Sequence, residues 1–107
     1  MSNWKAPIHP GEILADELAE IGVTAIELGR RLGVSKYRLY QIINGKRDLT
    51  ADTALRLGQF FGTGPEFWMN LQKAYELDVG RQKIGDQLKR IKRYAPTQVQ
   101  RASAPGA

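Results

Sequence analysis

The segment SKYRLYQIINGKR, residues 35 to 47, carries four basic side chains, two tyrosines, a glutamine and an asparagine, and it contains no acidic residue. If the segment is helical, its apolar residues Leu39, Ile42 and Ile43 fall on one side. The opposite side then presents one polar stripe at i, i+3, i+4 and i+7 spacing: Tyr37, Tyr40, Gln41 and Asn44. Side chains that donate and accept hydrogen bonds can read the edges of DNA bases, and flanking cations can bind phosphates. The segment therefore has the chemistry of a DNA-recognition helix.

The charges of the chain are divided into blocks. Residues 6 to 29 contain five acidic and no basic residues, whereas residues 30 to 47 contain six basic and no acidic residues. Residues 80 to 107 hold seven basic residues against one acidic residue. An ordinary solvated surface mixes both signs, so three separate blocks indicate more than one charged partner. The basic residues of the middle block are Arg30, Arg31, Lys36, Arg38, Lys46 and Arg47.

A helix-turn-helix pattern positions the candidate recognition helix. Two short helices are expected over residues 24 to 32 and 35 to 44, joined by a tight turn at residues 33 to 35. Thr24 followed by Glu27 is a capping box that begins the first of them. The second helix would enter the major groove of DNA with its N-terminal half leading. This pattern favours DNA binding.

Six helices are expected, because prolines and capping residues begin apolar segments of helical periodicity that glycines end. Strand signals are nearly absent, so the expected fold class is all-α, with five short helices and a looser sixth. We expect a helix-turn-helix domain over residues 1 to 78, with the motif at 24 to 44, a basic C-terminal helix within 79 to 94, and a disordered tail over 95 to 107. The expected helices cover residues 10 to 21, 24 to 32, 35 to 44, 50 to 62, 65 to 77 and 81 to 93.

Composition limits the class of protein. The chain has 107 residues, 42% of them hydrophobic, which suffices for one domain with a real core. It has no cysteine, so disulfides and thiolate metal sites are excluded and a reducing cytosol is the natural compartment. Its first residues, MSNWKAPIHPGE, contain no apolar h-region, and no apolar run is as long as a membrane span, so we expect a soluble cytoplasmic protein without a membrane partner, at the nucleoid when bound to DNA.

No group of residues points to catalysis or to a cofactor. His9 is the only histidine and has no second ligand at metal spacing, so we expect a capping or packing role before Pro10. Glu12, Asp16 and Glu17 lie on the first turns of a helix, where carboxylates favour the macrodipole. Neither a nucleophile nor a histidine base accompanies them. The chain is therefore expected to be no enzyme and to need no metal or cofactor.

Three motifs resemble the HigA-type antitoxins of bacterial toxin–antitoxin pairs, a branch of the Cro/C1-type (XRE) helix-turn-helix family that includes virulence-associated protein I. The motifs are IHPGEIL (8 to 14), LGVSKYRLYQIINGKR (32 to 47) and LTADTALRLGQFFGTGPEFWMNLQ (49 to 72). The resemblance covers roughly residues 7 to 78 and implies a compact five-helix domain like that of lambda repressor. It also implies a homodimer that binds a palindromic operator, represses its own operon, and neutralises a basic RelE-like (HigB-like) toxin that cleaves messenger RNA.

The resemblance assigns roles to residues of the candidate recognition helix. It implies base reading by Lys36, Tyr37, Tyr40 and Gln41. It implies phosphate binding by Ser35, Arg38, Asn44, Lys46 and Arg47. Two positions depart from many relatives: Ala25 stands where a glutamine often grips phosphate, and Gly29 stands at an inward position where alanine is common. Arg30, Arg31 or Arg38 would then replace the missing contact, and Gly29 would let the two helices cross closely.

Two further surfaces are expected to bind proteins. Phe60, Phe61, Phe67, Trp68 and Tyr75 most simply form core, but the resemblance suggests that Trp68 and Leu71 cross a dimer axis. The acidic residues of the first helix would dock a basic toxin, with a merely solvated face as the alternative. These residues are Glu12, Asp16, Glu17 and Glu20.

Other functions remain open on the sequence. The chain could be a stand-alone transcriptional regulator without a toxin, or an interaction module whose helix-turn-helix no longer reads DNA. Residues 30 to 47 contain six basic and no acidic residues, which argues against the interaction module. The basic helix at 81 to 93 could contact phosphates, pack on a partner subunit, or fold only on binding. The apolar side of this helix lacks the aromatic residues that are typical of a helix lying on a membrane surface.

Overall fold

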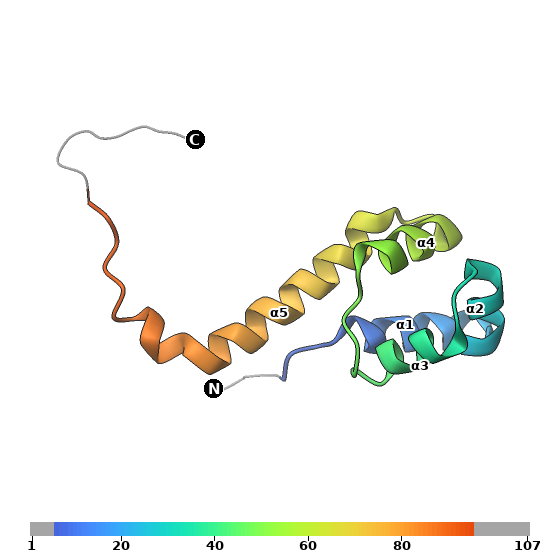
Figure 1. Cartoon of the computed structure of the whole chain (residues 1–107), viewed down its shortest axis with the longest axis horizontal. Helices are drawn as coiled ribbons and strands as arrows, with labels where there is room; N and C mark the ends of the chain where they lie inside the picture. The colour runs from blue at the N-terminus through green and yellow to red at the C-terminus, as the bar shows by residue number, and fades with distance from the viewer. Residues whose placement is uncertain (1–5, 96–107) are drawn as a thin grey trace.

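The computed structural model describes residues 6 to 95, which form five α-helices without a strand. Figure 1 shows their arrangement. The helices are α1 (Pro10–Ile21), α2 (Ala25–Leu32), α3 (Lys36–Ile43), α4 (Ala51–Phe61) and α5 (Pro65–Leu88). The expected all-α class is confirmed. The tail expected to be disordered lies, apart from its first residue, outside the described residues.

Side-chain caps begin three of the helices: His9 caps α1, Thr24 caps α2 and Ser35 caps α3. His9 caps α1 through its Nδ1, which accepts a hydrogen bond from the Gly11 amide at 2.9 Å, and the expected capping role is confirmed. Thr24 caps α2, but its Glu27 carboxylate pairs with two arginines instead of completing the expected capping box. Thr50 occupies the N-cap position of α4 without a side-chain capping bond.

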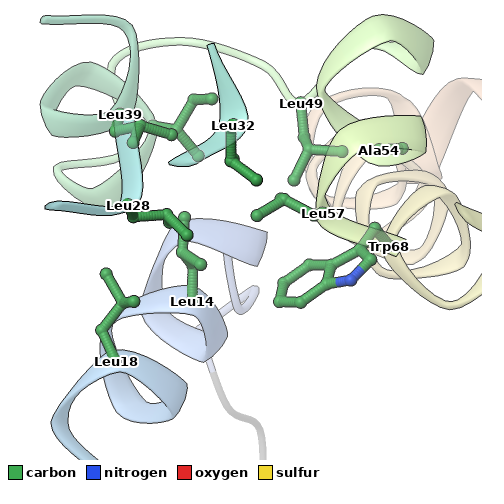
Figure 2. Packing of buried hydrophobic residues seen from close by; sticks show 10 residues of the cluster. Leu14, Leu18, Leu28, Leu32, Leu39, Leu49, Ala54, Leu57 and Trp68 are labelled. Carbon is green, nitrogen blue, oxygen red and sulfur yellow. The ribbon is translucent and has the colours of Figure 1, made fainter. Parts of the chain in front are cut away.

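One hydrophobic core joins all five helices. Figure 2 shows Leu14 and Leu18 of α1 beside Leu28 of α2, with Leu57 and Trp68 closing the core from α4 and α5. Trp68 is 0% exposed, the largest fully buried side chain among the described residues. Phe67, which was expected in the core, is 42% exposed. Phe60 and Phe61 are partly buried and pack against the core.

Two glycines allow helices to approach closely. A Cβ on Gly11 of α1 would lie 1.8 Å from the carbonyl oxygen of Ile42 in α3. A Cβ on Gly29 of α2 would lie 2.9 Å from the carbonyl oxygen of Val34 in the turn and 3.5 Å from Leu39 Cδ1 of α3, so Gly29 lies where α2 meets the turn and α3 closely, as expected. Only glycine fits at position 11 without a shift of the helices, because the Ile42 carbonyl oxygen cannot move without moving the backbone of α3. The placement of α3 against α1 therefore depends on the missing side chain at Gly11.

The expected boundary between a helix ending near Leu77 and a separate basic helix over 81 to 93 is wrong. A single helix, α5, runs to Leu88, with one non-helical residue at Ile84 (φ −122°, ψ 16°). The charge changes near residue 80, but a change of charge does not end a helix. Every described residue from 81 onward except Gly85 is exposed, and Figure 1 shows this part of α5 projecting away from the other helices. None of the helices described is both long and apolar enough to cross a bilayer.

Candidate nucleic-acid interface

The α2–turn–α3 unit has the geometry of a helix-turn-helix. Gly33 ends α2 in the left-handed conformation (φ 76°), which reverses the chain within one residue. Ser35 then begins α3, and its hydroxyl accepts a hydrogen bond from the Arg38 amide at 3.1 Å. The motif expected at residues 24 to 44 is thus present, with α2 and α3 held at a short, defined turn.

The side of α3 away from the core is exposed. Leu39 and Ile42 are fully buried, whereas Tyr37 is 70% exposed and Tyr40 is 41% exposed. Gln41 and Asn44 are exposed as well, so the polar stripe faces solvent along its whole length. Of the predicted base-reading residues, Lys36 is exposed next to this stripe, with its ammonium 6.0 Å from the ring centre of Tyr37. The predicted residues therefore form one continuous surface.

Three cations border the stripe without a carboxylate partner among residues 6 to 95: Lys36, Lys46 and Arg47. All three are exposed. An unpaired exposed cation can exchange its counterions for a DNA phosphate, and the released counterions favour binding. The surface thus offers hydrogen-bonding groups in its centre and positive charge at its ends.

Arg38 differs from these three cations because it is bound within the domain. Its guanidinium donates to Asp52 of α4 at 2.9 Å, and Asp52 also accepts from Arg56 at 2.8 Å. Arg56 donates to the carbonyl oxygen of Leu32 at the end of α2, also at 2.8 Å. This chain of hydrogen bonds links α2, α3 and α4. Phosphate binding by Arg38 stays a prediction, but its first role is to hold α3 against α4.

The ion pairs lower the pKa values of two carboxyl groups, those of Asp52 and Glu27. Hydrogen bonds from Arg56 and then Arg38 lower the pKa of Asp52 below its usual value. The hydrogen bond from Arg31 is the main cause that lowers the pKa of Glu27. A lowered pKa means that each pair stabilises the fold above the carboxyl's ordinary pKa. That contribution is lost as the pH falls through the lowered value.

Arg30 and Arg31 were expected to replace the phosphate contact missing at Ala25. Both pair with Glu27, three and four residues earlier on α2. They remain exposed, with side-chain exposures of 72% and 54%, so pairing within the helix does not remove them from solvent. Phosphate binding by these arginines stays a prediction.

The predicted dimer contact at Trp68 is wrong, because this side chain has no exposed surface to offer a partner. Leu71 is partly buried against the core, so its role at an interface stays a prediction.

The predicted toxin-binding residues lie on α1, and Glu12 among them accepts a hydrogen bond from the His9 amide at 3.3 Å. The other three, Asp16, Glu17 and Glu20, are exposed and have no basic partner among the described residues.

Sequence reasoning missed the Asp52 network and the constraint at Gly11. Asp52 and Arg56 stand at i, i+4 spacing, which signals a helical ion pair but does not reveal that Arg38 joins it. His9 was expected to cap or pack, and it does both. Its ring also packs edge-on against the ring of Tyr75 in α5, with the two ring centres 4.8 Å apart. His9 therefore connects the beginning of α1 to α5.

These features define a class of protein. A small all-α domain whose α2 and α3 form a helix-turn-helix, with polar and basic side chains exposed on α3, is a helix-turn-helix DNA-binding domain. A helix-turn-helix family model, HTH_3, matches residues 14–68.

Similar proteins narrow this class. Virulence-associated protein I of Dichelobacter nodosus is 46% identical over 81 residues, which cover 75% of each chain. An addiction module antidote protein of the HigA family from Coxiella burnetii is 48% identical, with a TM-score of 0.81 over 84% of this chain and 100% of that one. Antitoxin HigA of Pseudomonas aeruginosa, solved with the higBA promoter, is 43% identical, with a TM-score of 0.76 over 80% of this chain and 96% of that one. This chain belongs to the HigA family of helix-turn-helix antitoxins.

Proposed function

We propose that this chain binds a palindromic operator as a homodimer, represses its own operon, and neutralises a RelE-like toxin that cleaves messenger RNA. The observation that carries the DNA-binding part is the exposed stripe of α3, bordered by three cations without carboxylate partners. The promoter complex of the Pseudomonas relative supports it.

In the proposed complex, α3 lies in the major groove. Lys36 at the beginning of α3 suits the acceptors of guanine, and Gln41 suits the paired donor and acceptor of adenine. Ser35, Asn44, Lys46 and Arg47 lie at the two ends of α3, where phosphates flank an inserted helix. A homodimer would place its two copies of α3 about 34 Å apart to read two half-sites. Leu71 is retained as a candidate contact of that dimer.

The toxin-binding part of the proposal rests on α1. Three exposed carboxylates without basic partners, Asp16, Glu17 and Glu20, give α1 the charge that a basic protein surface would complement. Glu12 belongs to the same helix but also closes the capping box at His9. The description of the Coxiella relative as an antidote protein supports the assignment of an antitoxin role.

Replacing Gln41 with alanine should separate specific from nonspecific DNA binding. We expect Gln41→Ala to weaken operator binding by about 1 to 3 kcal/mol and to leave binding to a scrambled duplex nearly unchanged. Lys46→Ala is the matched control, since loss of a phosphate contact should weaken both complexes alike and reduce the salt slope by about 0.9. Fluorescence anisotropy with both duplexes over a salt series measures these effects. Equal loss on both duplexes for Gln41→Ala would contradict base reading.

Co-expression tests the antitoxin role. The tagged chain, expressed with the small open reading frame beside its gene, should elute as a stoichiometric complex with a basic partner. Asp16→Asn combined with Glu20→Gln should weaken that complex, because the variant removes charge from α1 without touching the cap at His9. Asp48→Asn combined with Glu66→Gln removes the same charge from exposed positions elsewhere and should leave the complex intact. If the chain elutes alone, and expression of the neighbouring open reading frame is not toxic, a stand-alone regulator is favoured.

A further inference from the structure

The segment KRIKRY, residues 89 to 94, is a strongly basic and exposed extension of α5. It follows the last helical residue, Leu88, and continues as a turn and irregular chain. Four of its six residues are basic, and the other two are 71% (Ile91) and 83% (Tyr94) exposed. The segment therefore contributes nothing to the core of the domain.

The charges of this basic extension are largely unpaired. Lys89 lies 3.8 Å from Asp86, which is a loose pair between highly exposed groups. Arg90, Lys92 and Arg93 have no carboxylate partner between residues 6 and 95. The family model ends at residue 68, well before the extension. Such a concentration of positive charge attracts a polyanion, and an exposed tyrosine hydroxyl can also donate to phosphate.

Helix α5 places the basic extension at a distance from α3. The helix keeps contact with the other helices as far as Tyr75, whose ring meets that of His9, and then rises about 20 Å before it ends at Leu88. In Figure 1, α3 lies along the lower edge of the helical domain, and the far end of α5 comes down toward the same edge before the chain turns upward from it. A duplex lying against α3 and continuing along that edge would pass near the beginning of the extension.

We propose that residues 89 to 94 form a second DNA-contacting element, which binds phosphates of the duplex flanking the operator. The proposal rests on the proposed function, since it requires α3 to bring the chain to DNA. A second copy of this chain is a poor partner for the extension, because pairing two extensions would place like charges together. The flanking duplex supplies regularly spaced phosphates whatever its sequence, so these contacts would add affinity without specificity.

DNA length provides the test. The full chain is titrated with a duplex trimmed to its two half-sites, and with the same duplex extended by about ten base pairs at each end. We expect the longer duplex to bind about tenfold or more tightly at moderate salt, with a salt slope steeper by about 0.9 for each added phosphate contact. The variant Arg90→Gln, Lys92→Gln, Arg93→Gln should lose this length dependence and bind the trimmed duplex like the wild type. Its exposed positions leave the fold unchanged, which circular dichroism verifies.

A charge-conserving variant serves as the control. Arg90→Lys combined with Arg93→Lys should keep the length dependence, because phosphate attraction depends on charge. Equal binding of both duplexes by the wild type, or a length dependence that survives the triple substitution, would overturn the proposal. Loss of toxin co-purification in the triple variant with its length dependence intact would also overturn it and assign the extension to the toxin. Failure of the wild type to bind either duplex would instead refute the proposed function.

Discussion

Replacing Gly11 with alanine should destabilise the domain by about 3 kcal/mol or more, a large part of the 5 to 15 kcal/mol that stabilises a typical domain. The new Cβ would meet the Ile42 carbonyl oxygen at 1.8 Å and the Ile43 Cα at 2.9 Å. Both atoms belong to the backbone of α3, so the strain cannot be relieved by a side-chain rotation. The helices α1 and α3 must move apart, which opens the core around Leu14 and shifts the end of the exposed stripe of α3. Urea unfolding followed by circular dichroism measures the loss.

Gly80→Ala is the matched control for Gly11→Ala. Gly80 also lies within a helix, but a Cβ there would meet no atom within 4 Å. The control should therefore be neutral or stabilising by up to about 1 kcal/mol, because alanine favours a helix more than glycine does. If Gly11→Ala unfolds at the same urea concentration as Gly80→Ala, the close crossing of α1 and α3 does not exist in solution.

The local features of the fold could be predicted from the sequence because their causes are local. Capping residues and glycines set where most helices begin and end, and periodicity separated the buried side of α3 from its exposed stripe. Leu39 and Ile42 are fully buried and Tyr37 is largely exposed, as expected. The stripe on which the proposed DNA binding depends was therefore identifiable before the structure.

Features that depend on the approach of distant residues could not be predicted in the same way. The basic run at residues 30 to 47 looked uniformly available to phosphates, yet Arg38 pairs with Asp52, fourteen residues later. Periodicity within α3 cannot reveal a partner on α4. Gly11 looked like an ordinary residue at the beginning of a helix, because only the packed structure brings the α3 backbone against it.

The extent of α5 was mispredicted for a related reason. The expected boundary near residue 80 coincided with a change in charge. Gly80 stands at that point, but it lies in the helix rather than at a left-handed cap, and a Cβ there would meet no atom within 4 Å. A glycine costs a helix only about 1 kcal/mol, which the flanking turns overcome. Sequence therefore predicted the helical character correctly as far as Leu88, but residues 89 to 93 are not helical, and the continuity with the fifth helix was missed.

The burial of Trp68 assigns it to the core rather than to a dimer interface, and replacing Trp68 tests this assignment. Trp68→Ala should cost about 3 to 5 kcal/mol of folding free energy, because it leaves a large cavity between α4 and α5. Trp68→Phe should cost much less, because the ring keeps most of the volume. It also removes an indole N–H that is buried without a hydrogen-bond partner among the described residues. Phe67→Ala, at a neighbouring position that is 42% exposed, is the control for loss of an aromatic ring and should cost less than Trp68→Ala.

The same variants separate a core residue from an interface residue when stability and assembly are measured together. Urea unfolding reports the free energy of folding, and sedimentation equilibrium reports the dissociation constant of the proposed dimer. For a core residue, Trp68→Phe leaves dimer dissociation unchanged, and Trp68→Ala weakens assembly only under conditions in which it also unfolds the domain. A Trp68→Phe variant that keeps wild-type stability but dissociates into monomers would contradict the buried position of Trp68 and restore it to the dimer interface.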